Sequence, residues 1–63
     1  MSDFKTRLET EQKELVEKIG KLEEFLTNGN TEVVTKDQLT LLKIQLKAMD
    51  TYNTCLVERI VRL

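Results

Sequence analysis

The chain has 63 residues, a net charge of −1 and neither histidine nor proline. Its one cysteine cannot close an internal disulfide, and without histidine the sequence lacks the usual ligand set of a zinc site. The nearly balanced charge argues against a binder of nucleic acid polymers, because such proteins concentrate basic residues.

The small size predicts self-association. Ordering a chain costs roughly 1.5 kcal/mol of conformational free energy per residue, and burial of apolar surface in a core this small offsets about the same amount. Small folds therefore usually need a further source of stability, such as a disulfide, a metal ion or oligomerisation. With no disulfide or metal site expected, we predict a homo-oligomer whose copies cover one another's apolar faces. The lone Cys55 fits a reducing compartment, and no stretch has the apolar length of a bilayer span or a signal peptide. We therefore expect a cytoplasmic protein without a membrane partner.

The first predicted element is an amphipathic helix over about residues 3–27, with Ser2 or Asp3 suited to cap its start. Apolar residues recur at spacings of four and three, which places them along one edge of a helix. This stripe consists of Leu8, Gln12, Leu15, Ile19, Leu22 and Leu26. Glutamate precedes lysine by four residues at three places, as in Glu14 and Lys18, a pattern typical of a solvated face.

A polar loop is predicted over residues 28–35, and a second helix over about residues 36–62. Asn28 and Gly29 accept the left-handed backbone that commonly ends a helix, and Thr35 to Gln38 has the pattern of a capping box. The same spacing of three and four residues then recurs in a stripe of the second helix, which consists of Leu39, Leu42, Leu46, Met49, Asn53, Leu56, Ile60 and Leu63. The fold class is therefore all-α: one antiparallel, coiled-coil-like hairpin of two helices over residues 1–63.

Polar residues interrupt both stripes, Gln12 in the first helix and Asn53 in the second. In an antiparallel hairpin both lie toward the open end, where they can form a hydrogen bond across the interface or contact a ligand. A polar residue at such a position fixes register at some cost in stability.

The second helix has more apolar surface than one partner helix can cover. A second stripe runs beside the first, formed by Leu41, Ile44, Ala48, Tyr52 and Cys55, with Val57 and Val61 further round. A single hairpin cannot bury both stripes, which is a second reason to expect assembly.

Catalysis is not expected from this composition. A Ser–His or Cys–His arrangement needs histidine, and the chain has no glycine-rich phosphate loop. Cys55 lies beside Tyr52 on an apolar face, where a buried structural thiol is expected rather than a nucleophile. We predict a non-enzymatic protein without cofactor or metal.

The open end of the hairpin is the candidate ligand site. The first helix brings Phe4 and Arg7 to this end, and the second brings Tyr52 and Arg59, which are seven residues apart and so share a face. Arginine suits phosphate because its planar fork donates two hydrogen bonds together, and an aromatic ring offers a stacking surface for a base. The same residues are also common at ordinary interfaces, and Arg59 could instead pair with Glu11.

The order of residues resembles that of small helical-hairpin proteins of bacteriophages. The pattern is Phe4-x-x-Arg7-Leu8, Leu22-x-x-Phe25-Leu26, then Leu41-Leu42-x-x-Gln45-Leu46-x-Ala48-Met49-x-x-Tyr52-x-x-x-Leu56-x-x-Arg59-Ile60. It resembles a group from crAss-like phages, and its second half is similar to the hairpin of the phage sponges that oppose the CBASS and Thoeris defence systems.

The resemblance implies a non-enzymatic immune antagonist. Members of those sponge families form homo-oligomers, often hexamers, and hold cyclic nucleotide signals in pockets between protomers. Phe4, Arg7, Tyr52 and Arg59 are the residues we expect at such a pocket, with a cyclic oligonucleotide or a cyclic ADP-ribose isomer as ligand. The chain is shorter than those sponges and lacks their N-terminal extension.

Two other classes of function fit the same pattern. The second apolar stripe could dock on another protein without any small ligand, or the chain could be a small structural coiled coil in a virion. A protein-binding module predicts a monomer or dimer on its own, whereas a sponge predicts a larger homo-oligomer that binds a nucleotide.

Overall fold

The computed structural model describes residues 3–29 and 31–63 of the chain. Its elements are the helix α1 (Asp3–Asn28), a short 3-10 helix η1 (Thr31–Val33) and the helix α2 (Lys36–Val61). Each long helix begins at the predicted residue and ends within one residue of the predicted bound, while η1 was not expected. Ser2 as a cap lies outside the described residues.

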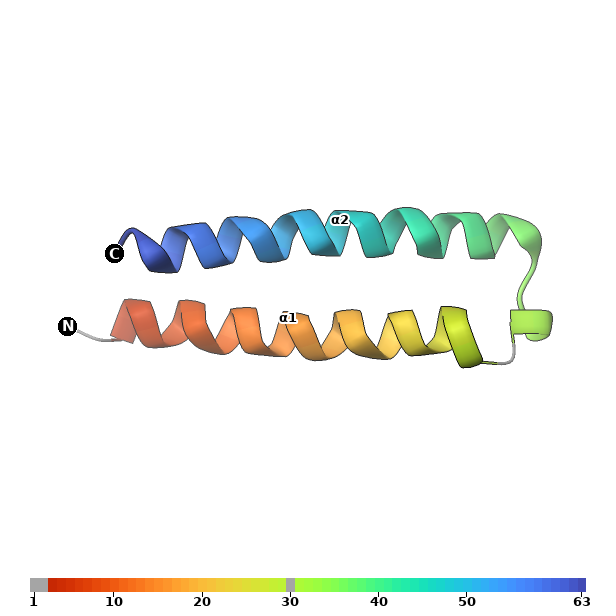
Figure 1. Ribbon diagram of the computed structural model, residues 1–63, viewed down its shortest axis with the longest axis horizontal. Coiled ribbons are helices and arrows are strands. Elements are labelled where there is room, and N and C mark those ends of the chain that lie inside the picture. Colours follow the sequence, from red (N-terminus) through yellow and green to blue (C-terminus); the bar gives the residue numbers. More distant parts are fainter. Residues whose placement is uncertain (1–2, 30) are drawn as a thin grey trace.

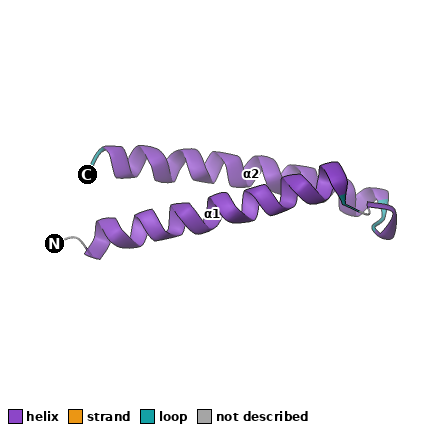
Figure 2. Ribbon diagram, turned by 60° about the horizontal axis from the view of Figure 1, so that its bottom comes forward, coloured by secondary structure: helices purple, strands orange, loops and turns teal. Residues whose placement is uncertain are grey.

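The two helices lie antiparallel along their whole length, as Figures 1 and 2 show. The start of α1 and the end of α2 lie at one end of the molecule, and η1 lies at the other. The molecule is a rod with extents of 48 × 15 × 13 Å. Neither α1 nor α2 combines the length and the apolar character that crossing a membrane requires. The prediction of an all-helical hairpin is confirmed for the described part of the chain.

The core is a single row of contacts between α1 and α2. Its buried members are Leu8, Leu15, Ile19 and Leu56, and the half-buried Leu46, Met49 and Ile60 pack against them. All of these belong to the two predicted stripes, because spacings of three and four keep side chains on one edge of a helix. The prediction was wrong for Leu63, which is 59% exposed because it lies beyond the end of α2.

The polar interruptions of the two stripes meet across the interface. Gln12 donates a hydrogen bond from Nε2 to Oδ1 of Asn53 at 2.9 Å, between two half-buried side chains. This confirms the structural interpretation of these residues. Because the bond joins positions 41 residues apart in the chain, it aligns α1 with α2 in one register.

The loop end depends on one side-chain cap and one glycine. Thr35 accepts a hydrogen bond at Oγ1 from the backbone N–H of Gln38 at 3.1 Å, which is one of the two reciprocal bonds of the predicted capping box. Gly29 does not adopt the left-handed backbone, since no described glycine has a positive φ. Its N–H bonds to the carbonyl of Phe25 at 2.9 Å, and an added Cβ would lie 2.5 Å from that oxygen. Glycine is needed there for close approach, so the prediction of a left-handed cap was wrong.

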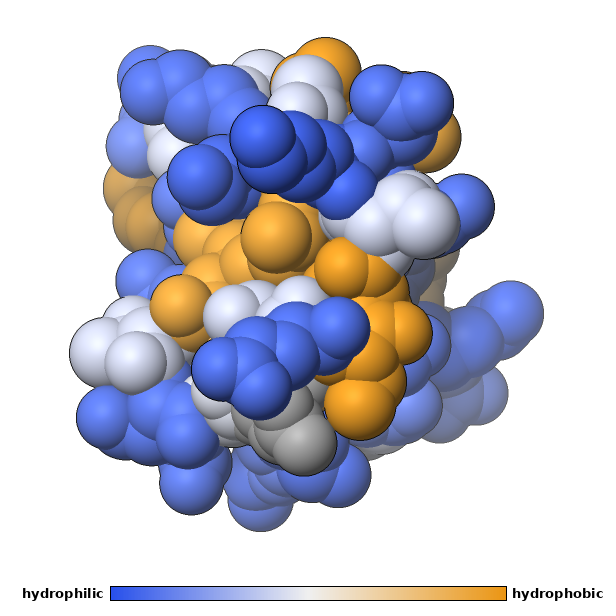
Figure 3. Space-filling view, turned by 90° about the vertical axis from the view of Figure 1, so that its right-hand side faces the viewer, coloured by the Kyte–Doolittle hydropathy of each residue, from blue (hydrophilic) through white to orange (hydrophobic). Residues whose placement is uncertain are grey.

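Apolar surface remains outside the core at both the loop end and the side of α2. Figure 3 shows apolar surface in the middle of the loop end with hydrophilic surface around it, and Val33 in η1 is 73% exposed. Along α2, Leu41, Ile44 and Tyr52 are exposed by 57%, 59% and 44%, as the second stripe predicted. Cys55 is also exposed, which corrects the expectation of a buried thiol: it lies outside the row of core contacts between α1 and α2.

The fully buried Leu56 is the most sensitive position of this core. We expect Leu56→Ala to lower the free energy of unfolding by about 2–5 kcal/mol, because it removes packing and leaves a cavity. The matched control is Leu63→Ala, the same change at an exposed leucine, for which a change within about 0.5 kcal/mol is expected. Urea denaturation followed by circular dichroism measures both, and equal losses would contradict the assigned core.

The bond between Gln12 and Asn53 is testable by a double-mutant cycle. Gln12→Leu or Asn53→Leu alone leaves one half-buried amide without its partner, and each should destabilise by about 1–3 kcal/mol. The double variant should regain most of that loss and lose the fixed register. Urea denaturation gives the coupling free energy, and additive single effects would rule out the bond in solution.

Candidate functional site

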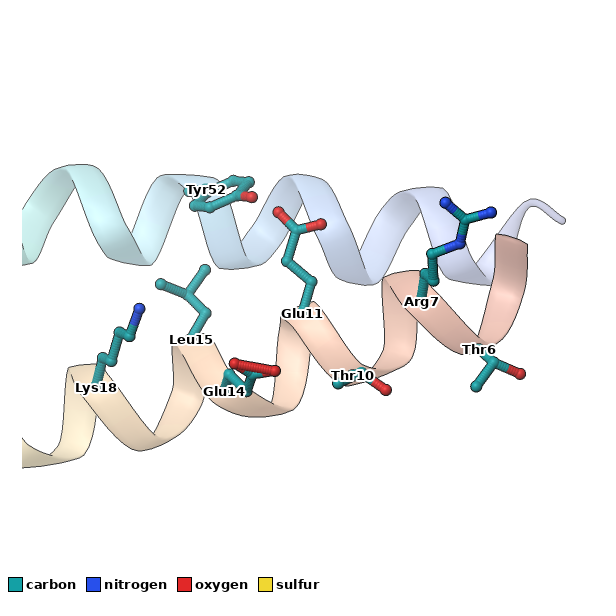
Figure 4. Close-up of a pocket in the computed structure, with 8 residues that line it drawn as sticks. All are labelled: Thr6, Arg7, Thr10, Glu11, Glu14, Leu15, Lys18 and Tyr52. Atoms are coloured by element: carbon teal, nitrogen blue, oxygen red, sulfur yellow. The ribbon is translucent and has the colours of Figure 1, made fainter. Parts of the chain in front are cut away.

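A groove runs along one side of the hairpin toward the open end. It has a volume of about 530 Å³. Seven of its lining residues come from α1 and one from α2: Thr6, Arg7, Thr10, Glu11, Glu14, Leu15, Lys18 and Tyr52 (Figure 4).

The helical repeat of α1 builds the charged wall of this groove. Arg7, Glu11, Glu14 and Lys18 lie one after another at spacings of four, three and four, so they occupy one face beside the core stripe. Figure 4 shows Arg7, Glu11 and Lys18 extending toward α2. The groove therefore carries two basic and two acidic groups along one wall.

Tyr52 supplies the opposite wall from α2. Tyr52 is 44% exposed, and its ring lies across from Leu15, one of the buried core residues. The aromatic face is thus supported by the core on one side and open to the groove on the other. Such a ring can pack against a planar ligand without a change in the fold.

The charged side chains that line the groove, all within the described residues, do not form ion pairs with one another. Among residues 3–29 and 31–63, the salt bridge that forms joins Arg62 to Glu58, outside the groove. Arg7 and Lys18 can therefore offer N–H donors to an anion, while Glu11 and Glu14 repel it. The net charge of the groove in one chain is close to zero.

The structure brings two of the four predicted ligand residues together. Arg7 and Tyr52 line the same groove, whereas Phe4 and Arg59 do not belong to its lining. Phe4 is 53% exposed at the start of α1, and no ion pair joins Arg59 to Glu11 within the described part of the chain. Their role in binding stays a prediction.

Sequence reasoning missed the other polar members of the groove. Glu14 and Lys18 were placed on a solvated face, Glu11 was considered only as an ion-pair partner of Arg59, and Thr6 and Thr10 were not considered. For Thr10, Glu11, Glu14 and Lys18, the signal that could have found them is their spacing of three, four, seven and eleven residues from Arg7, which puts them on one edge of α1. Thr6 directly precedes Arg7, and its spacing gives no such signal.

A second groove of about the same volume lies between other edges of the two helices. Its lining is more apolar and consists of Glu9, Gln12, Lys13, Val16, Val57, Ile60 and Val61. It lacks an aromatic ring and an arginine, so it offers less to a nucleotide than the first groove.

Neither groove contains the parts of a metal centre. In the part of the chain that the structure describes, no three Asp, Glu or Cys side chains gather in a way that could hold a metal ion. The chemistry that the first groove can perform is recognition: hydrogen bonds and charge from Arg7 and Lys18, and stacking on Tyr52.

Comparison with known proteins connects the chain to a protein family. The Sequestin family profile matches residues 2–62, nearly the whole chain. No curated protein and no solved structure shows a match to this chain.

Proposed function

We propose that this chain, which belongs to the Sequestin family, binds and sequesters a cyclic nucleotide signal of a bacterial defence system without cleaving it. The observation that carries the proposal is the family match over residues 2–62, since the family name suggests sequestration. The groove with Arg7 and Tyr52 supports a nucleotide as the ligand.

The groove offers the two interactions that a nucleotide uses most. The guanidinium of Arg7 donates two parallel hydrogen bonds to a phosphate. Tyr52 offers a face for a base, and such stacking contributes about 1–3 kcal/mol per base. Both residues line one groove, so one ligand can reach both.

A single chain cannot enclose such a ligand. Small-molecule pockets bury most of the surface of their ligand, whereas this rod is only 15 × 13 Å across its long axis. The proposal therefore includes a homo-oligomer, in which a second copy closes the groove and adds donors that offset Glu11 and Glu14.

Sequestration requires affinity and copy number but no reaction. A small helical protein made by a phage in the cytoplasm of its host would hold the signal away from its receptor and so silence the defence. No bond of the ligand is broken in this mechanism, so intact ligand should be recovered from the protein after denaturation.

The first test is calorimetry of the purified chain against a panel of cyclic dinucleotides, cyclic trinucleotides and cyclic ADP-ribose isomers. We expect tight binding of one class, with fewer ligands than chains because pockets are shared between copies. Absence of binding across the panel would overturn the nucleotide part of the proposal.

The residue-level test compares two exposed arginines. Arg7→Ala should weaken binding of the ligand found in the panel by about tenfold or more, because a hydrogen bond to a charged group contributes about 1.5–3 kcal/mol. Arg62→Ala is the matched control, since Arg62 pairs with Glu58 away from the groove and should leave affinity unchanged. Equal effects of the two variants would exclude this groove.

The acidic residues of the groove provide a test in which binding should become tighter instead of weaker. Glu11→Gln removes a negative charge from the groove and should tighten binding of an anionic ligand by about two- to fivefold, the scale of exposed charge interactions. The effect should shrink as salt is raised, because salt screens exposed charges. Calorimetry at two salt concentrations measures both, and weaker binding by this variant would contradict an anion in the groove.

The exposed apolar stripe of α2 favours one alternative, a non-catalytic protein-binding or structural coiled-coil module. This alternative predicts a chain that binds no member of the nucleotide panel but forms a stable complex with a protein partner or is retained in virions.

A further inference from the structure

One exposed face of α2 is apolar, whereas the exposed residues of α1 are mostly charged or polar. Its residues are Leu41, Ile44, Ala48, Tyr52 and Cys55, all of them exposed. Leu41 and Ile44 are exposed by 57% and 59%, far more than leucine and isoleucine in the core. A contiguous apolar face of this kind on a surface helix marks an interaction surface.

The order of residues on this face is symmetric about Ala48. Leu41 and Cys55 lie seven residues to either side of it, and Ile44 and Tyr52 lie four residues to either side. Further out, Asp37 and Arg59 lie eleven residues to either side. Steps of four, seven and eleven keep all seven positions on one face of a helix.

We propose that this face is an isologous interface with a second copy of this chain, in which the two α2 helices pack antiparallel about a two-fold axis beside Ala48. In such an interface residue i meets residue j and j meets i. Leu41 then meets the partner's Cys55, and Ile44 meets the partner's Tyr52. Ala48 meets the partner's Ala48, where a small side chain lets the two helices approach closely.

Charge complementarity selects this partner and this orientation. Asp37 meets the partner's Arg59 at one end of the interface, and Arg59 meets the partner's Asp37 at the other. Both side chains are exposed, and neither takes part in an ion pair within residues 3–29 and 31–63. A parallel pairing would instead bring Asp37 beside Asp37 and Arg59 beside Arg59, which is unfavourable.

The matched segment is long enough for a specific interface. It runs from Asp37 to Arg59, about 33 Å at the rise of an α-helix. Its centre is apolar and its ends are charged, the usual distribution of an interface core and rim. Because Tyr52 lies on this face and also lines the groove, the partner helix runs along one edge of the groove.

The interface goes beyond the proposed function and does not depend on it. Sedimentation and crosslinking report the interface without any nucleotide, whereas calorimetry reports nucleotide binding. A chain that associates as described but binds no nucleotide would overturn only the proposed function, whereas a chain that binds a nucleotide and associates through another face would overturn only the interface.

The geometric test is a disulfide across the axis. Leu41→Cys places a thiol opposite the partner's Cys55, and oxidation by added diamide, which takes up the two protons and two electrons, should convert most of the protein to a covalent dimer. The matched control Lys43→Cys puts the new thiol off this face and should crosslink several-fold less. The unaltered chain should crosslink little, because its two Cys55 residues would lie about 21 Å apart along the helices. Equal crosslinking of both variants, or rapid crosslinking of the unaltered chain, would overturn the proposal.

The electrostatic test uses two charge-reversal variants. Each should self-associate weakly by itself, and the two should associate with each other when mixed. Asp37→Arg sets two positive groups opposite each other, and Arg59→Asp sets two negative groups opposite each other. In sedimentation at low salt, each should self-associate at least about tenfold more weakly than the unaltered chain. An equimolar mixture should regain association, since every charge then faces its opposite.

Asp50→Arg, a charge reversal at an exposed position outside the face, is the matched control and should associate like the unaltered chain. Circular dichroism checks that every variant remains helical. A mixture no more associated than its components would overturn the proposal, as would a monomeric unaltered chain at about 100 μM, a concentration well above the Kd of a specific interface.

Discussion

The constraint behind every other feature is that two helices can bury only one edge each. The row of contacts between α1 and α2 buries Leu8, Leu15, Ile19 and Leu56, and nothing in a rod of two helices can cover the side chains outside that row. The apolar face of α2 and the charged groove are both left at the surface for this reason. A chain of this size thus presents much of its chemistry to partners and ligands.

The hydrogen bond between Gln12 and Asn53 determines which residues of the two helices lie side by side at the surface. A slip of one heptad would set Gln12 against Leu46 or Ile60 and leave a half-buried amide without its partner, which disfavours the slipped register. The register that the bond fixes sets Tyr52 across from Leu15 and beside the charged wall of α1. A polar pair in the core therefore determines the composition of a groove on the surface.

Features that depend only on helical periodicity were predictable from the sequence, whereas features that depend on side-chain placement were not. Spacings of three and four identify both helices, the buried row and the exposed face, because they need only the repeat of the helix. Cys55 was wrongly placed because periodicity puts it on an apolar face but does not say whether a partner covers that face within one chain. The groove was found only in part, since lysine and glutamate at helical spacing have the same pattern whether they face solvent or an aromatic ring across the interface.

Arg59 shows how the structure separates two roles that the sequence leaves together. It lies seven residues after Tyr52 and so shares its face, which suits a ligand residue and an interface residue equally. It does not line the groove that holds Arg7 and Tyr52, and its position mirrors that of Asp37 about Ala48. If Arg59 holds the partner's Asp37, its charge is neutralised there and the positive charge left for a ligand is that of Arg7 and Lys18. Assembly and recognition would then use different cations, with Tyr52 as the residue that belongs to both.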